Sequence, residues 1–382
     1  MRNRLTRTGW ALLLVGLLGG AVVAGEAEVV SLGTRRELFV DDLLLGQMQG
    51  VRLKLHEPTR LPRDVYPPRP TGHYATVIRD GDVYRLYYRG DKIPGAHWRD
   101  GWARYHGQEV TLYAESRDGY RWTTPDLKLY EIEQFPAGNV VLDKGLRSIA
   151  RATSKDFLQW SDPVIMEANQ AGEHLYTSGT HPYFRAPHIY IALATRFMAN
   201  RSSITDIVFL AARPGARRYT RLFPDAFIRP GLGQDGWGNR SNYIAWHIVP
   251  TSETQMSIYN VNGDHLVLRT DGFISVHAGA EEGEFLTKPF TFGGDRLEIN
   301  ESTSAAGRIR VEIQEPDGRP IAGYTLEQCV AIYGDRIRHI VEWADGQEKR
   351  SDVSALRGRP VRLRFALQEA DLYSFCFPAT RP

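Results

Sequence analysis

Residues 114–125 read Ala-Glu-Ser-Arg-Asp-Gly-Tyr-Arg-Trp-Thr-Thr-Pro, and the same pattern returns at residues 152–163, which read Ala-Thr-Ser-Lys-Asp-Phe-Leu-Gln-Trp-Ser-Asp-Pro. Alanine, serine, a basic residue, aspartate, tryptophan and proline occupy the same six positions in both copies. A repeat of this kind indicates a modular fold in which one structural unit recurs.

The residue types explain how the repeated unit folds. Ser116 and Asp118 can hydrogen-bond the nearby backbone in a tight turn, and Gly119 can adopt a positive φ within it. Trp122 follows the aspartate by four residues, so its ring can fold back over the turn and become buried. A strand, a tied turn and a tryptophan plug together predict the outer hairpin of a β-propeller blade. The alternative is that both are unrelated serine and aspartate turns.

Length and composition limit the number of domains, the kinds of partner and the use of disulfides. The 382 residues are enough for two domains. The formal net charge of +2 gives no reason to expect a polyanionic partner such as nucleic acid. The 8 tryptophans and 18 tyrosines suit β-structure, and they also suit sugar binding. Cys329 and Cys376 are too few for a disulfide scaffold, although they could pair within the last domain.

The N-terminus has the pattern of a secretory signal peptide. Arg2, Arg4 and Arg7 precede an apolar run over residues 10–23, and small residues allow cleavage after Ala24. The apolar core is short for a membrane span, and no later segment is apolar for about 18 residues. We therefore expect a signal peptide at 1–24 and an exported protein without a membrane span. An uncleaved anchor is the alternative.

The rest of the chain predicts an all-β protein in two parts. Residues 37–45 resemble a strand with two acidic residues within it, and the Asp80-Gly81 pair between two β-rich runs predicts a hairpin. A worn third copy of the repeat stands near residues 212–215. From about residue 271 short alternating strands replace the tryptophan turns, which favours a β-sandwich. We expect a β-propeller domain over residues 28–270 and a β-sandwich domain over residues 271–382.

The chain as a whole resembles exported propeller-plus-sandwich proteins related to families 32 and 43 of the glycoside hydrolases. The Ser-x-Asp-x-x-x-Trp pattern is similar to the Asp-box turn of β-propeller glycosidases. The resemblance is carried by residues 37–42, 113–119 with Trp122, 147–157 with Trp160, and 287–292. It implies a five-bladed type of propeller with acidic residues around an axial pocket. Because only 38 residues separate the two repeat turns (114 to 152), it also implies an incomplete propeller that lacks a blade.

Glycosidic hydrolysis needs two carboxyl groups, one acid and one nucleophile or base. The resemblance implies one of them on the first strand, where Asp41 and Asp42 are the candidates. Period-2 geometry sends their side chains to opposite faces, and which one faces the pocket stays open. Glu115 is the second catalytic candidate, and Glu173 is a weaker one. Each has a structural alternative, as a strand-end turn or as an ion pair between blades.

Arginines, an amide and an indole form a second group of candidates, because they can bind sugar hydroxyls or a uronate carboxylate. These are Arg185, Arg196, Trp237, Arg240 and Asn242. Ion pairs and solvent exposure are the alternatives for each. His174, His181 and His188 recur every seven residues, which does not build a metal site on β-structure. We expect no metal and no cofactor.

Two functions from different classes fit these features. The first is an exported glycoside hydrolase that cleaves a polysaccharide or oligosaccharide. The second is a non-catalytic carbohydrate-binding protein on a shortened propeller. A structural or adhesive protein with a relic propeller is a third. Carbohydrate is the expected partner, nucleic acid is not, and the oligomeric state stays open.

Overall fold

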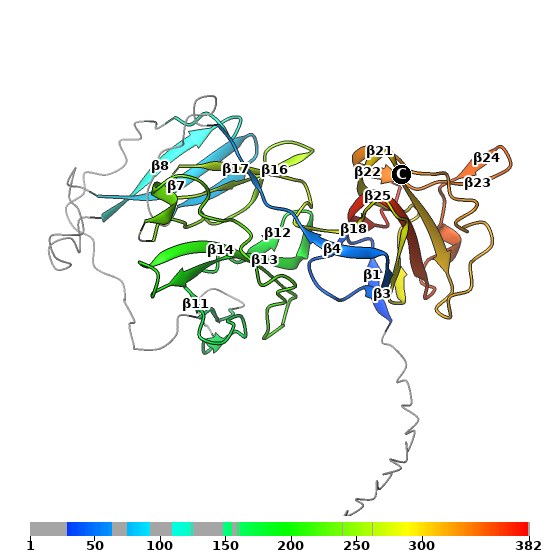
Figure 1. Cartoon of the computed structure of the whole chain (residues 1–382), viewed down its shortest axis with the longest axis horizontal. Coiled ribbons are helices and arrows are strands. Elements are labelled where there is room, and N and C mark those ends of the chain that lie inside the picture. The colour runs from blue at the N-terminus through cyan, green and yellow to red at the C-terminus, as the bar shows by residue number, and fades with distance from the viewer. Residues whose placement is uncertain are drawn as a thin grey trace, which may run out of the picture.

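The computed structural model describes residues 29–62, 75–91, 109–123, 125, 148–154, 159, 161–238, 240–261 and 263–380. These residues form strands, with two short 3-10 helices, η3 (Asp235–Trp237) and η4 (Ser354–Leu356), and no α-helix within the described part. The all-β prediction is confirmed. Figure 1 shows two lobes, one containing β6 to β17 and the other containing the long strands β21 and β25.

The first lobe is the propeller-type part, built from separate antiparallel sheets. One sheet has the order β6-β7-β8, and a second pairs β9 with β10. A third contains β11, β12, β13 and β14, and a fourth has the order β15-β16-β17-β5. Its strands are β5 (Thr59–Arg60), β6 (Thr76–Asp80), β7 (Val83–Asp91), β8 (Glu109–Ser116), β9 (Ala150–Arg151), β10 (Val164–Ile165), β11 (His174–Leu175), β12 (His181–Tyr183), β13 (Ala186–Met198), β14 (Ile204–Ala212), β15 (Val249–Pro250), β16 (Gln255–Tyr259) and β17 (His265–Arg269). Because β5 precedes β6 in the chain but pairs with the last strand, β17, it links the beginning of this lobe to its end.

The first repeat turn folds as its residues predict. Ser116 Oγ accepts a hydrogen bond from the Gly119 amide at 2.9 Å, and Asp118 Oδ1 accepts one from the Arg121 amide at 2.7 Å. Gly119 has φ +76°. Trp122 packs edge-on against Tyr259, with ring centroids 5.7 Å apart. The turn is thus tied locally and plugged by its tryptophan.

The other predicted turns are the hairpin at Asp80-Gly81 and the second and third copies of the repeat. The predicted hairpin at Asp80-Gly81 joins β6 and β7, which pair Asp80 with Val83. The worn third copy is a real hairpin, in which Ala211 bridges to Thr220. In the second copy, Asp156 and Trp160 lie outside the described residues, as does the predicted signal peptide.

The second lobe is organised around two long strands. β21 and β25 pair antiparallel along most of their length, and β2, β18 and β19 pair in turn with the other edge of β25. The strands are β1 (Val30–Gly33), β2 (Glu37–Leu38), β3 (Leu45–Gln49), β4 (Val51–Leu55), β18 (Ile274–Ala278), β19 (Gly283–Thr287), β20 (Phe290–Phe292), β21 (Glu298–Gln314), β22 (Asp335–Ile340), β23 (Trp343–Asp345), β24 (Glu348–Arg350) and β25 (Arg362–Cys376). Trp343, Phe285 and Phe365 are buried in its core.

One domain boundary is corrected by the strand pairing. Residues 28–270 were expected to form the propeller, but β2, β3 and β4 pair with β25, β19 and β18 of the second lobe. The chain therefore begins its described part in the sandwich, crosses to the first lobe near β5 and returns after β17. The amphipathic pattern of a strand shows that it needs a partner, but the partner is chosen by packing between residues far apart in sequence.

A continuous apolar core joins the two lobes. Phe209 and Phe227 of the first lobe pack against Phe273, whose ring stacks on Phe209 at 5.1 Å between centroids. Cys329 and Cys376 are both buried and both free, so the disulfide considered from the sequence is absent. Within the described residues, no helix has the length and apolar character needed to cross a membrane.

Candidate functional site

Inner segments from separate sheets of the first lobe meet at one place. The segment around Trp246 forms a parallel bridge with Thr76 of β6, in which the Trp246 amide donates to Ala75 O at 2.8 Å. The Trp246 indole N–H donates to Thr180 O at 2.9 Å, just before β12. Parallel contacts between the inner strands of different sheets are typical of a propeller axis. We call Thr180, His181, Trp246 and His247 the axial cluster.

His181 is the buried member of the axial cluster. Its Nδ1 lies 2.8 Å from Gly179 O, and its Nε2 accepts a hydrogen bond from the Ile248 amide at 3.2 Å. These partners require a neutral ring with the proton on Nδ1. Burial lowers the pKa of His181 to about 4, with a smaller lowering effect from His247. The ring is therefore uncharged near neutral pH.

Trp246 and His247 form the accessible part of the axial cluster. The Trp246 side chain is 40% exposed, and its ring lies 4.2 Å from that of His247. His247 has φ +81°, an unfavourable backbone conformation for a residue with a β-carbon. Its ring lies beside that of His181, with centroids 4.7 Å apart and the planes tilted by 36°. Strained residues of this kind cluster at ligand sites, because the surrounding packing must hold them in place.

The axial cluster offers stacking and hydrogen bonding but no acid. The Trp246 face can pack against the apolar face of a sugar ring, and imidazoles can accept or donate hydrogen bonds to hydroxyl groups. Within the described residues, the hydrogen bonds of Thr180, His181 and Trp246 go to hydroxyl or main-chain groups and never to a carboxylate. Such a site can bind a neutral sugar.

The first catalytic candidates lie at the border between the lobes. Asp41 is buried, and its carboxylate accepts two hydrogen bonds from Arg213, at 2.6 and 3.0 Å. Arg213 also donates to Glu37 at 2.9 Å. Asp42 is exposed, and Lys288 binds its carbonyl oxygen. The contacts of Asp41 are those of an ion pair that joins the two lobes.

Glu115 lies elsewhere, in the β6-β7-β8 sheet. Its backbone pairs with Thr123 across the repeat hairpin, and its carboxylate accepts a hydrogen bond from Tyr113 at 3.0 Å. Tyr113 in turn accepts one from Arg85. Asp41 lies between β2 and β3, whereas Glu115 is in β8, and among the described residues the two carboxylates share no hydrogen-bond partner.

Two of the three arginines predicted to bind sugar have ion-pair partners. Arg196 makes two hydrogen bonds to Asp206, directly opposite it in the β13–β14 pair, at 2.8 and 2.6 Å. Arg185 donates to Asp271 at 2.8 Å. Glu173, the weaker acid candidate, accepts from Arg221 at 2.8 Å.

Trp237, Arg240 and Asn242 do come together, in the loop that leads to the axial segment. Asn242 is buried and donates to Thr205 O and Gly236 O, both at 2.7 Å. Trp237 is 58% exposed. Arg240 lies over the Tyr176 ring, 5.8 Å from its centroid. This loop is a second exposed aromatic surface on the same lobe.

The axial tryptophan was missed by the sequence reasoning. Trp246-His247 lies between the loop that contains Asn242 and β15, and in the sequence this pair cannot be told from ordinary strand residues. His181 was noticed only as one of three evenly spaced histidines. Its Nε2 accepts a hydrogen bond from the Ile248 amide, 67 positions later in the chain, and its ring lies beside His247; spacing cannot reveal either contact.

No family model matches the sequence, and no curated protein is significantly similar to it. Among solved structures, the chain is similar to a family 43 arabinoxylan arabinofuranohydrolase from Bacillus subtilis in complex with cellotetraose, at 12% identity and TM-score 0.19. That comparison covers 80% of this chain and 66% of the Bacillus protein, just under two thirds of its length.

Two further structures are similar at the same low level. An exo-β-1,3-galactanase from Phanerochaete chrysosporium with β-1,3-galactotriose is 8% identical, with TM-score 0.28 and coverage of 80% of this chain and 96% of that one. A Bacteroides ovatus xyloglucan PUL protein of family 43 is 10% identical, with TM-score 0.26 and coverage of 85% and 100%. All three are glycoside hydrolases of the family that the sequence resembles.

Proposed function

We propose that this protein is exported and binds carbohydrate at the centre of its propeller-type lobe, where a sugar ring stacks on Trp246. The observation that carries this proposal is an exposed tryptophan next to the strained His247, whose indole N–H donates to Thr180 O and whose backbone amide donates to Ala75 O. Preorganised aromatic faces of this kind suit sugar rings, because they present apolar area at little cost in side-chain entropy. The neutral His181 adds no charge, which favours an uncharged sugar unit at this position.

Replacing Trp246 by alanine should weaken binding to a polysaccharide about tenfold or more, equivalent to about 1.4 kcal/mol. Affinity electrophoresis against a panel of plant, algal and microbial polysaccharides would first identify the ligand. Isothermal titration calorimetry would then compare the parent, Trp246→Ala and Trp246→Phe, which keeps an aromatic face.

Trp237→Ala is the matched control, because it removes another exposed indole from the same lobe. Loss of binding in Trp237→Ala with full binding in Trp246→Ala would move the site to the loop that contains Arg240. Thermal unfolding of each variant separates a lost contact from a lost fold.

Hydrolysis of a glycosidic bond is the second candidate function. It is the activity that the resemblance implies, and Asp41, Asp42 and Glu115 remain its proposed carboxylates. The full export-competent chain, expressed and incubated with the same panel, would be assayed for release of reducing sugar. If these residues are catalytic, Asp41→Asn, Asp42→Asn and Glu115→Gln should each lower the rate by at least about 100-fold. Activity that survives all three substitutions would refute the assignment of the site.

The contacts of Asp41 make one result of that assay informative. Since Asp41 is paired with Arg213, Asp41→Asn should reduce stability as well as any activity. A variant that loses activity only above its own lowered unfolding temperature has lost its fold and not a catalytic group. Carbohydrate binding without hydrolysis by the parent protein would favour the first proposal over the second.

A further inference from the structure

Two cavities flank strand β22 on the second lobe, and neither belongs to the axial cluster. The first has a volume of about 580 Å³ and lies between the start of β21 and residues 378–380. The second has a volume of about 390 Å³ and lies between β22 and the segments around Tyr333 and Lys349. Arg338 and Ile340 line both. Since β22 pairs only with β21 among the described strands, it is an edge strand that a long ligand can cross.

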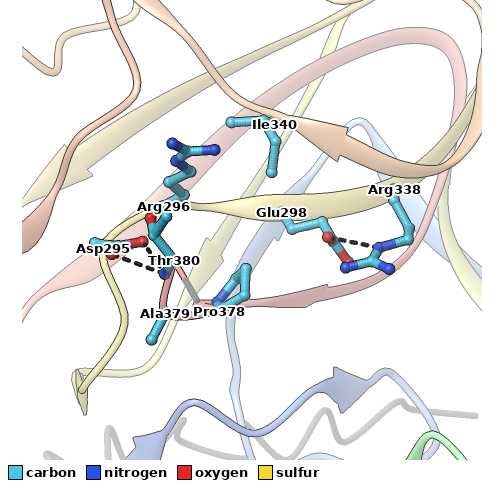
Figure 2. Close-up of a pocket in the computed structure, with 8 residues that line it drawn as sticks. All are labelled: Asp295, Arg296, Glu298, Arg338, Ile340, Pro378, Ala379 and Thr380. Carbon is cyan, nitrogen blue, oxygen red and sulfur yellow. Dashed lines mark hydrogen bonds and ion pairs between the residues drawn. The ribbon is translucent and has the colours of Figure 1, made fainter. Parts of the chain in front are cut away.

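Cations dominate the exposed rim of these cavities. Arg296 and Arg338 line the first cavity, and Figure 2 shows them at its opposite ends. Arg336, Arg338 and Lys349 line the second. The Arg338 side chain is 61% exposed and that of Lys349 is 56% exposed. Within the described part of the chain, Arg296 and Arg336 form no ion pair with a carboxylate, and Arg336 instead bonds His339 Nδ1 at 2.7 Å.

The acidic groups near these cavities have partners or lie below the surface. Glu298 is buried and shared between Arg36 and Arg338, the latter contact being 2.9 Å from Nε (Figure 2). Asp295 accepts hydrogen bonds from the Thr380 amide and lies 3.4 Å from Arg357.

Two more carboxylates, Glu342 and Glu301, lie near the second cavity. Glu342 lies 3.3 Å from Lys349 on the rim of the second cavity. Glu301 is fully buried, with both oxygens lacking a hydrogen-bond partner, and is 3.4 Å from His339 Nδ1. These carboxylates are thus mostly paired or buried. The Arg296 guanidinium, the terminal nitrogens of Arg338 and the N–H groups of Arg336 that do not bond His339 or Tyr333 can still bind an anion.

An aromatic ring stands beside these cations. Tyr333 lines the second cavity and is 65% exposed, and its carbonyl oxygen accepts a hydrogen bond from Arg336. Arginine binds carboxylates and sulfates through paired N–H groups, and an exposed tyrosine offers a face for stacking. A repeating acidic sugar presents both features, a ring and an anionic group, at regular intervals.

We propose that the two cavities beside β22 bind the anionic groups of an acidic polysaccharide, with the chain lying across β22 and Arg338 between two subsites. The anionic group is a uronate carboxylate or a sulfate ester. That the anionic group belongs to a glycan rests on the proposed function. That the site binds an anion at all rests on Arg296, Arg336 and Arg338. This site is separate from the axial cluster and has the opposite preference, for charged and not for neutral sugar units.

The test is a binding measurement on the full mature protein with four probes. These are polygalacturonate, the same polymer with its carboxyl groups reduced, a sulfated galactan and double-stranded DNA. The double variant Arg336→Gln with Lys349→Gln should bind polygalacturonate or the sulfated galactan about tenfold more weakly than the parent. This follows because two exposed charges are removed from one anion site. The two acidic polymers distinguish the carboxylate from the sulfate.

Arg319→Gln is the matched control, since Arg319 is an exposed cation of the same lobe that lines neither cavity. It should bind as the parent does, and Trp246→Ala should keep its affinity for the acidic polymer. Unchanged binding in the double variant, equal binding of polygalacturonate and its carboxyl-reduced form by Trp246→Ala, or full competition by DNA would each overturn the proposal. Loss of neutral-glycan binding in Trp246→Ala concerns the proposed function only, so the two can fail separately.

Discussion

Asp271→Asn is expected to lower the free energy of unfolding by about 3–5 kcal/mol, the range seen when one partner of a buried ion pair is removed. Asp271 is fully buried where β17 leads into β18, at the crossing between the lobes. Its Oδ2 accepts hydrogen bonds from Arg185 at 2.8 Å and from Ser374 at 2.6 Å. Its Oδ1 accepts one from Tyr183 at 2.7 Å.

The asparagine variant isolates the charge from the backbone. Asp271 has φ +63°, a conformation that asparagine tolerates and alanine does not, so Asp271→Ala would add a second cost. Without the carboxylate, the half-buried Arg185 and the buried Arg36, which lies 3.8 Å from Asp271 Oδ2, face a neutral amide, and the Tyr183 hydroxyl loses its charged acceptor. Burial and the Asp271 carboxylate together raise the pKa of Tyr183 well above its usual value, so this hydroxyl stays a donor.

Equilibrium unfolding in urea, followed by fluorescence and by circular dichroism, would measure this change. Coincidence of the two transitions tests whether the lobes unfold together, as their shared core predicts. Asp42→Asn is the control, because Asp42 is exposed and should change stability by less than about 0.5 kcal/mol. An Asp271→Asn protein within 1 kcal/mol of the parent would show that the buried ion pair is not what holds the crossing.

Arg213→Met is expected to have the second large effect, again about 3–5 kcal/mol near neutral pH. Arg213 lies just after β14 in the first lobe, and it binds Asp41 and Glu37 of the second. Methionine keeps much of the apolar stem, so the loss reports the charge. Two buried carboxylates would remain without their cation, and His188 would be the remaining partner of Glu37, at 2.8 Å.

This effect should depend on pH in a defined direction. Burial acts to raise the pKa of Glu37, but hydrogen bonds from His188 and Arg213 outweigh it, and the pKa is lowered overall. A lowered folded-state pKa contributes stability above the unfolded-state pKa of about 4.3, and this contribution is lost as the pH falls through the folded-state value. The difference between the parent and Arg213→Met should therefore be largest above about pH 5 and should shrink in acid.

Unfolding midpoints measured from about pH 3 to 8 would test this. Arg319→Met, which removes an exposed arginine, should follow the parent at every pH. A difference between the parent and Arg213→Met that grows as the pH falls would contradict the assignment of Glu37 as the group responsible.

Local chemistry determined those parts of the molecule that the sequence could predict. The turn at Ser116–Gly119 and the hairpin at Asp80-Gly81 close within a few residues, so side-chain acceptors and glycine are enough to specify them. The all-β class follows from many such turns between alternating strands. The tryptophan of each turn indicated a repeated unit before any partner strand was known.

Tertiary structure alone decided which strands pair and which side chains meet. Residues 37–45 were predicted to form one strand, but β2 ends at Leu38, residues 39–44 turn, and β3 begins at Leu45. The partner of β2 is β25, more than 330 positions later. That pairing places Asp41 against Arg213 and makes an expected catalytic residue an ion pair between the lobes. Trp246 meets Thr180 and β6 for the same reason. The alternation of apolar residues in a strand shows only that one face of the strand must be buried. Which residues cover that face depends on the packing of the whole chain.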